Sequence, residues 1–164
     1  MRRKEGFSLV ELLIVLAVMA ALIATITPVA LNAIRKAKAT QVAQNLKTLA
    51  SALENAAYVN GVDESSDIVK NSSGTAVTLT DLGRDIDSAN YAVYYDVDNG
   101  TVEATVVSLE DVNLTEVQKI LSGAAQSTYS ADLIGAETPV EGSSWPGSLS
   151  GETLTYYNFS FTVY

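Results

Sequence analysis

The chain has 164 residues, which is enough for one domain with a hydrophobic core but short for two. It contains no cysteine and no histidine, so disulfides, thiolate metal sites and cysteine nucleophiles are excluded, and the commonest general base is absent. With 10 Lys and Arg residues against 19 Asp and Glu residues, the net charge is -9. No nucleophile–base pair, phosphate loop or metal-ligand spacing emerges, and we expect no enzymatic activity.

The charges are unevenly distributed along the chain. Residues 1–60 hold seven bases and three acids, whereas residues 61–164 hold three bases and sixteen acids, a net charge of -13. A surface that acidic repels phosphate backbones. We therefore expect no direct nucleic-acid binding by the distal part.

Residues 7–31 are almost wholly apolar, with one acid, Glu11, among them. As a helix they would measure roughly 37 Å, enough to cross a hydrocarbon core of about 30 Å. A glutamate buried there costs roughly 2.5–3.5 kcal/mol, which suggests a functional role. The apolar run is too long for an ordinary secretory signal, and the bases in residues 2–4 favour a cytoplasmic N-terminus. A plain single-pass anchor would leave Glu11 unexplained.

The leader Arg2-Arg3-Lys4-Glu5-Gly6, followed by Phe7-Ser8-Leu9-Val10-Glu11, resembles the prepilin signal of bacterial type IV pilins and pseudopilins. The resemblance implies that residues 1–6 are a leader peptide. A membrane peptidase would cleave between Gly6 and Phe7 and methylate the new amine of Phe7. Glu11 matches the assembly glutamate of the family. The resemblance to the family is specific over residues 2–31. Beyond residue 60 the chain resembles the family only in its expected architecture.

Charge chemistry agrees with the role that the resemblance gives to Glu11. Cleavage would create an ammonium at Phe7 in the same apolar layer as the Glu11 carboxylate. Opposite charges attract strongly in a medium of low dielectric constant, and each is costly alone. We expect Glu11 to dock beside the N-terminus of another subunit and so set the axial register of a filament.

Pro28 lies inside the predicted helix and removes one backbone hydrogen bond. It predicts a kink or local melting over residues 21–28, and the resemblance implies a segment that loosens during assembly. A simple bend is the open alternative.

Residues 32–59 form the amphipathic half of the same predicted helix. One face collects apolar residues, and Asn60-Gly61 is a stop signal. That face consists of Val42, Leu46, Leu49, Leu53 and Ala57. Residues 7–59 thus predict one helix of roughly 80 Å, whose half at residues 7–31 spans the membrane or fills a filament core.

Residues 60–164 predict an acidic globular β-sheet domain. Two alternating runs flank Asp98-Asn99-Gly100, which is the strongest hairpin signal, and residues 154–164 alternate as a terminal strand. Weaker signals predict a helical turn at residues 67–69, a strand at residues 76–80 and a helix from Asn113 to Ala124. The predicted fold class is α+β, with a long N-terminal α-helix packed against a C-terminal antiparallel β-sheet.

The candidate calcium loops and the N-glycosylation patterns of the sequence each have a purely structural interpretation as well. The acids around Asp98 resemble the start of a calcium loop, but the later glutamate is missing and a hairpin turn is favoured. Pseudopilins often carry calcium in the C-terminal half, and a loop flanked by Asp132, Glu137 and Glu141 is the other candidate; no other cofactor or metal is expected. N-glycosylation patterns begin at Asn71, Asn113 and Asn158, and we favour structural roles for them because the pattern is common by chance.

The resemblance implies a structural subunit of a type IV pilus. Its partners would be identical subunits, the prepilin peptidase and methyltransferase, and an assembly platform in the inner membrane. The chain would lie in that membrane before assembly and in a cell-surface pilus afterwards. Pilins usually close a C-terminal loop with a disulfide, which this chain lacks, so a type II secretion pseudopilin or a minor pilin stays open. A membrane-tethered binding module is the alternative from another class.

Overall fold

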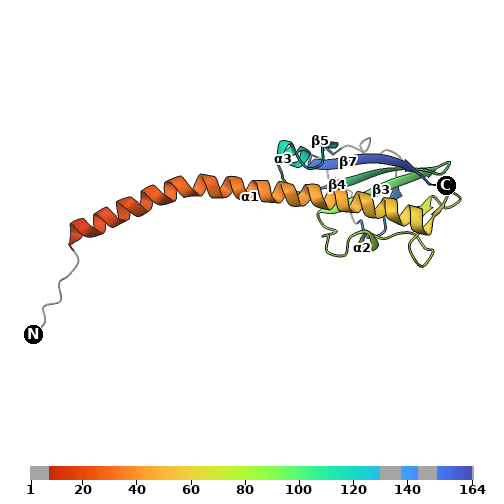
Figure 1. Ribbon diagram of the computed structural model, residues 1–164, viewed down its shortest axis with the longest axis horizontal. Coiled ribbons are helices and arrows are strands. Elements are labelled where there is room, and N and C mark those ends of the chain that lie inside the picture. The colour runs from red at the N-terminus through yellow and green to blue at the C-terminus, as the bar shows by residue number, and fades with distance from the viewer. Residues whose placement is uncertain (1–7, 130–137, 144–150, 164) are drawn as a thin grey trace, which may run out of the picture. The chain divides into compact units, whose positions relative to one another are not determined.

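The structure is a computed structural model that describes residues 8–129, 138–143 and 151–163. The chain divides into two compact units, Met1–Ala37 and Lys38–Tyr164. Helix α1, Leu9–Asn60, begins in the first unit and ends in the second (Figure 1). It agrees with the predicted helix at residues 7–59, except that Ser8 precedes the helix and Phe7 lies outside the described residues.

Within the second unit, α1 buries one face against a β-sheet. The five apolar residues predicted for this face are all buried, and Ala39, Ala43 and Ala50 lie beside them. Alanine at these positions allows the helix backbone to approach the strands closely. The helix ends where Gly61 adopts a φ of 82° and donates its N–H to the Ala57 carbonyl oxygen at 2.9 Å, as predicted.

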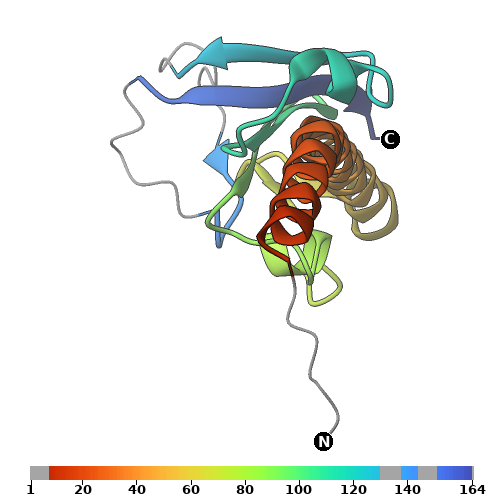
Figure 2. The ribbon, with the colours of Figure 1, turned by 90° about the vertical axis from the view of Figure 1, so that its left-hand side faces the viewer.

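The sheet has five strands in the order β5-β7-β4-β3-β6, and every pair is antiparallel. The strands are β3 Tyr91–Asp98, β4 Thr101–Ser108, β5 Ala124–Thr128, β6 Thr138–Pro139 and β7 Thr153–Thr162. Figure 1 shows β3, β4 and β7 running alongside the second part of α1, and Figure 2 shows them on one side of it. The α+β fold class is confirmed.

The predicted hairpin is formed by β3 and β4. The strands pair without interruption from Tyr91 opposite Ser108 to Asp98 opposite Thr101. The two turn residues, Asn99 and Gly100, have φ values of 48° and 75°. Two positive φ angles define the type I′ turn, whose twist matches that of the strands. The hairpin prediction is confirmed.

The sheet carries apolar residues on both faces. The face toward α1 contributes Tyr91, Val93, Tyr95 and Val97, as the alternation predicts. The opposite face has a smaller cluster of buried residues, which consists of Ala92, Tyr94, Val107 and Leu154. Burial of alternate residues on opposite faces explains why β3 and β4 are apolar over most of their length.

The segment after α1 corrects the first weak prediction. Residues 67–69 do not form a helical turn. Strands β1, Val62–Asp63, and β2, Ile68–Val69, pair antiparallel instead. Asp67 has a φ of 54°, and Val69 is fully buried. The β-branched pair Ile68-Val69 favours a strand once one side chain has a core to enter.

The strand predicted at residues 76–80 is also wrong, apart from two isolated bridges, from Ala76 to Lys70 and from Thr78 to Glu141. The next residues form the short helix α2, Leu79–Leu82. Thr78 caps this helix, since its side chain accepts from the Asp81 N–H while the Asp81 carboxylate accepts from the Thr78 N–H. This reciprocal capping box outweighs the β propensity of the threonines.

Helix α3, Leu114–Gln118, confirms the predicted cap at Asn113. The predicted helix was too long, because Ala124 begins strand β5. Strands β5 and β6 were not predicted. The sequence of β5, Ala-Ala-Gln-Ser-Thr, has no alternation of large apolar and polar residues, and it pairs with the edge of β7.

A group of polar side chains joins α1 to the sheet near the start of the second unit. The Tyr91 side chain is hydrogen-bonded to those of Asn45 and Ser108, and burial raises the pKa of its hydroxyl. Lys38 Nζ lies 2.7 Å from Glu110 Oε2. The first contact joins α1 to β3 through Asn45, and the second joins α1 to the segment that follows β4. They fix the position of the helix along the strands.

Four carboxylates gather near the end of β3. Burial raises the pKa of the Asp96 carboxyl, and Asp67, Asp98 and Glu103 raise it further. Asp67 is not free to turn away, because its Oδ1 accepts from the Val97 N–H at 2.8 Å. Asp96 is thus an acid that folding makes harder to ionise.

We predict that Asp96→Asn stabilises the domain at neutral pH. A carboxyl whose pKa is raised on folding loses stability above that pKa, and the loss vanishes as pH falls below the ordinary value of 3.8. The gain should be about 0.5 kcal/mol near pH 7 and absent at about pH 3.5, because the site is partly exposed. Urea denaturation at both pH values measures it.

The matched control is Asp111→Asn, since Asp111 is an exposed acid in the segment that follows β4. If the two variants gain equal stability at neutral pH, the gain comes from the lower net negative charge of the domain and not from the carboxylates around Asp96. A gain for Asp96→Asn that persists in acid would likewise contradict the carboxylate cluster as its cause.

Candidate membrane and assembly segment

The described part of the first unit is exposed and apolar. Every residue from 8 to 37 is exposed, and the exposed fraction of its large apolar side chains runs from 48% at Val15 to 75% at Leu9. These side chains are Leu9, Val10, Leu12, Leu13, Ile14, Val15, Leu16, Val18, Met19, Leu22, Ile23, Ile26, Val29, Leu31 and Ile34. They face all directions around the helix, so a surrounding apolar medium is needed to cover them.

Membrane is one such medium. Among the described residues, α1 is the helix that is long and apolar enough to cross a bilayer, judged by length and composition, and its most apolar window is not buried by the rest of the chain. Residues 9–34 would span roughly 39 Å as a helix, against a hydrocarbon core of about 30 Å. Covering each large aliphatic side chain is worth about 1.5–3 kcal/mol.

Glu11 lies in the first turn of α1 and has a specific local partner. Its Oε2 accepts from the Ser8 backbone N–H at 3.0 Å, and the Leu12 N–H donates to the Ser8 carbonyl oxygen at 3.1 Å. Ser8 is therefore the residue before the helix and Glu11 its third residue, which is half of a capping box. The positive end of the helix dipole also favours a carboxylate here.

The cap on Glu11 was missed from the sequence, although its signal is present. Ser8-Leu9-Val10-Glu11 has the Ser-x-x-Glu spacing of a capping box at the start of an apolar run. No cation among residues 8–129, 138–143 and 151–163 forms an ion pair with Glu11. The carboxylate is thus bound to its own helix by one oxygen and remains able to accept from another group.

α1 stays helical through Pro28. Two hydroxyls just before it bond to the preceding turn, Thr25 Oγ1 to the Leu22 carbonyl oxygen at 2.9 Å and Thr27 Oγ1 to that of Ile23 at 2.8 Å. These bonds satisfy the hydroxyls inside an apolar segment, as a membrane requires. Kinking or melting at Pro28 stays a prediction for the assembled state.

Several predicted site residues lie outside the described residues. These are Gly6 and Phe7 at the predicted cleavage site, and Asp132 and Glu137 of the alternative calcium loop. Glu141 is exposed, and its backbone carbonyl oxygen accepts from the Leu79 N–H at 2.8 Å. Within the described ranges no group of three or more His, Cys, Asp or Glu residues is placed to hold a metal ion.

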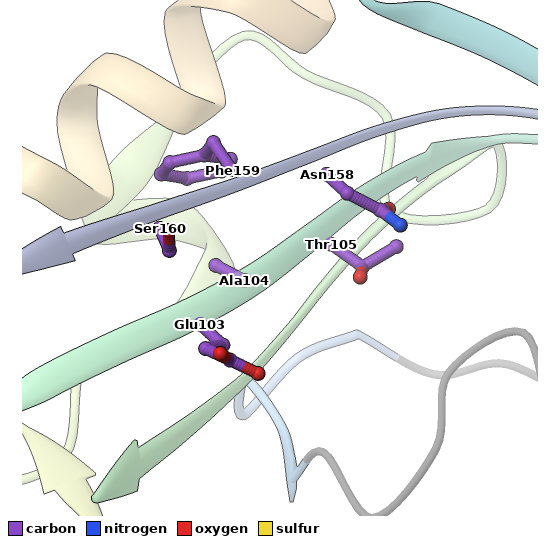
Figure 3. Close-up of a pocket in the computed structure, with 6 residues that line it drawn as sticks. All are labelled: Glu103, Ala104, Thr105, Asn158, Phe159 and Ser160. Carbon is purple, nitrogen blue, oxygen red and sulfur yellow. The ribbon is translucent and has the colours of Figure 1, made fainter.

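The sheet face opposite α1 has an open hollow between β4 and β7 (Figure 3). Its lining is Glu103, Ala104, Thr105, Asn158, Phe159 and Ser160. Glu103 is the one ionisable side chain among these six, and it lies directly opposite Ser160 in the pairing of β4 with β7. We take the exposed apolar N-terminal segment, which contains Glu11, as the candidate functional site.

Comparison with known proteins gives a match at this same segment. Residues 1–27 match the family described as the prokaryotic N-terminal methylation motif, which covers Gly6, Phe7 and Glu11. Neither the curated proteins nor the solved structures contain a match to the chain. The matched motif is a structural signature and not an enzymatic one. Over residues 1–27 the chain therefore carries the prepilin signature of type IV pilins and pseudopilins, and this signature leads into the long apolar part of α1.

Proposed function

We propose that this chain is a structural subunit of a type IV pilus. The observation that carries the proposal is the apolar surface of residues 9–34, which is exposed on all sides and contains one charge, Glu11. A plain membrane anchor needs the apolar surface but gains nothing from an acid within it. In a filament core of packed helices, the apolar surface would pack against other subunits and the Glu11 carboxylate would pair with a charge of a neighbouring subunit.

Processing would supply the partner for that acid. Hydrolysis of the Gly6–Phe7 peptide bond releases residues 1–6 and leaves a charged amine on Phe7, which keeps its charge when methylated. In a neighbouring subunit, Glu11 already uses one oxygen for its own Ser8 N–H. Its second oxygen would accept from the Phe7 ammonium across the interface. In an apolar core this pairing relieves the cost of two buried charges.

The membrane stage follows from the same segment. With the bases of residues 2–4 in the cytoplasm, α1 would cross the inner membrane and place residues 38–164 on the outer side. The assembly platform would then pass subunits from the membrane to the growing filament. The apolar helix exchanges lipid for other helices, so little apolar surface meets water at any step.

A pseudopilin of a type II secretion system, or a minor pilin, is the second candidate. One observation favours it: the chain has no cysteine, so the C-terminal disulfide usual in pilins cannot form. Deleting the gene separates the candidates. Loss of surface filaments identifies a major pilin, whereas intact filaments with a loss of protein secretion identify a pseudopilin.

We predict that Gly6→Val blocks processing. A branched side chain beside the scissile bond crowds the peptidase site, so the chain should keep residues 1–6 and form no filaments. Intact mass measurement of the protein extracted from membranes reports the cleavage. The control is Glu5→Gln, which changes the leader without changing the bond. A wild-type chain that begins at Met1 in assembled filaments would contradict the proposed processing.

A further inference from the structure

The four N-glycosylation patterns of the chain are not equivalent in the folded protein. Each has an asparagine followed two residues later by a serine or threonine, at Asn71, Asn99, Asn113 and Asn158. Glycan transfer requires an asparagine amide nitrogen that can reach solvent, next to an accessible hydroxyl. The hydrogen bonds and exposure of each site decide which asparagine meets these requirements.

Asn71 uses its side chain to close a loop. Its Nδ2 donates to the Ala76 carbonyl oxygen at 3.3 Å and to Asp81 Oδ2 at 3.4 Å. Its Oδ1 accepts from the backbone N–H groups of Ser73 and Thr75 at 3.0 and 3.2 Å. A sugar on Nδ2 would replace one of its two N–H groups and remove one of the first two bonds that hold the loop, so Asn71 is a poor acceptor.

Asn158 is exposed but lies within a regular sheet. It belongs to β7, directly opposite Thr105 of β4, and both line the hollow in Figure 3. Eight consecutive residues of β7 are paired with β4 around it. A transferase would have to lift this part of the strand out of its hydrogen bonds to close around Asn158.

Asn99 is exposed in the tight turn between β3 and β4, and its Nδ2 donates to Asp98 Oδ1 at 2.8 Å. Asn99 and Gly100 both have a positive φ, so a transferase would have to open this turn to close around Asn99.

Asn113 differs from these three. It lies in the connection between β4 and α3, and Asn113 and Thr115 are both exposed. Its Oδ1 accepts from the Glu116 N–H at 3.4 Å, as the cap of α3. No group among the described residues bonds to its Nδ2. The geometry points to Asn113 as a glycosylation site, with a lipid-linked oligosaccharide as the sugar donor.

The reaction would use the free nitrogen and keep the cap. Asn113 Nδ2 forms a C–N bond to the anomeric carbon of the first sugar and loses a proton to a base of the transferase. The bond from that carbon to the phosphate oxygen breaks, and the polyprenyl pyrophosphate leaves with the electron pair. No oxidation or reduction takes place. Because Oδ1 is unchanged, α3 retains its N-cap after modification.

The surrounding contacts present this acceptor at a fixed place. Gln126 Nε2 donates to the Val112 carbonyl oxygen at 3.3 Å, and Lys38 is paired with Glu110. Both anchor the connection just before Asn113. In the cell, modification rests on the proposed export of residues 38–164, because lipid-linked oligosaccharides serve proteins outside the cytoplasm. The test below does not depend on that export.

The test uses the full chain in detergent, a single-subunit bacterial oligosaccharyltransferase and a polyprenyl-pyrophosphate-linked oligosaccharide. Trypsin cleaves after Lys70, Arg84 and Lys119, which places Asn71 in peptide 71–84, Asn99 and Asn113 in peptide 85–119, and Asn158 in peptide 120–164. A further cut after Glu103 by a glutamyl endopeptidase separates Asn99 from Asn113. We expect a glycan mass increment on the fragment that contains Asn113 and none on the others. Asn113→Gln and Thr115→Ala should lose the increment, whereas Thr115→Ser should keep it.

Asn71→Gln, Asn99→Gln and Asn158→Gln are the matched controls and should leave the increment unchanged. A synthetic peptide of residues 109–117 shows whether the same pattern is accepted when unfolded. An unmodified chain beside a modified peptide would mean that the fold hides Asn113 and would overturn the proposal. If neither the chain nor the peptide is modified, or if the glycan is found mainly on Asn71, Asn99 or Asn158, the proposal is overturned as well. Filament formation by the unmodified chain would leave the pilus proposal intact in each of these cases.

Discussion

Replacing Glu11 by glutamine is expected to abolish filaments while membrane insertion and cleavage continue. Glutamine keeps an oxygen that can accept from the Ser8 N–H, so the first turn of α1 remains capped. It removes the negative charge, so the ammonium of a neighbouring Phe7 loses its partner in an apolar core. An unpaired buried charge costs roughly 3–5 kcal/mol per subunit, which is enough to prevent polymerisation. Electron microscopy of sheared cell-surface material measures the effect.

A second variant, Glu11→Ala, removes both the negative charge and the oxygen that accepts from the Ser8 N–H. The proposed pairing predicts that alanine and glutamine abolish filaments equally. If glutamine supports normal filaments and alanine does not, the carboxylate serves its own helix end and not a neighbouring subunit. Mass measurement of both variants must show the loss of residues 1–6, so that a processing defect is not mistaken for an assembly defect.

Leu53→Ala is expected to cause a large loss of stability in the second unit. Leu53 is fully buried on the face of α1 that meets the sheet. Removing its side chain leaves a cavity among packed apolar groups, which costs about 2–5 kcal/mol. Urea denaturation of the full chain in detergent, followed by the near-ultraviolet circular dichroism of its tyrosines, measures the change.

The matched control is Thr48→Ala, because Thr48 lies exposed on the opposite side of the same helix. A change there should stay within about 0.5 kcal/mol. If the two variants lose equal stability, α1 is not docked on the sheet through the face that contains Leu53. Retention of the helical signal in the far ultraviolet would show that the apolar half of α1 persists when the second unit unfolds.

The long helix and the main hairpin were predictable because their signals are local and strong. The apolar run, the regular spacing from Val42 to Ala57 and the stop at Gly61 all point to one helix. Asn99-Gly100 has few conformations open to it other than a tight turn. The alternation in β7 was equally clear, since aromatic residues alternate with small polar ones over most of the strand.

The remaining elements depend on contacts that no local pattern reveals. Strand β5 consists of small and polar residues, and it is a strand because the edge of β7 is there to pair with it. Ile68-Val69 could follow either a turn or a strand until Val69 enters the core. The cap from Ser8 to Glu11 was readable from its spacing, but its distances required the structure.

The two units of the chain differ in what stabilises them. The described part of the first unit buries none of its large apolar side chains within the chain, so its stability depends on lipid or on other subunits. The second unit has its own core and a net charge that resists nonspecific association. This division is what a subunit requires if it is stored in a membrane and later polymerised.

The most direct test of the proposed function is the N-terminal residue of the chain in purified cell-surface filaments. Filaments sheared from cells are collected, and the chain within them is sequenced from its N-terminus by mass spectrometry. The proposal predicts a chain that begins with N-methylated Phe7 and makes up the bulk of the filament. A chain that is absent from filaments and begins at Met1 in the membrane fraction would contradict it.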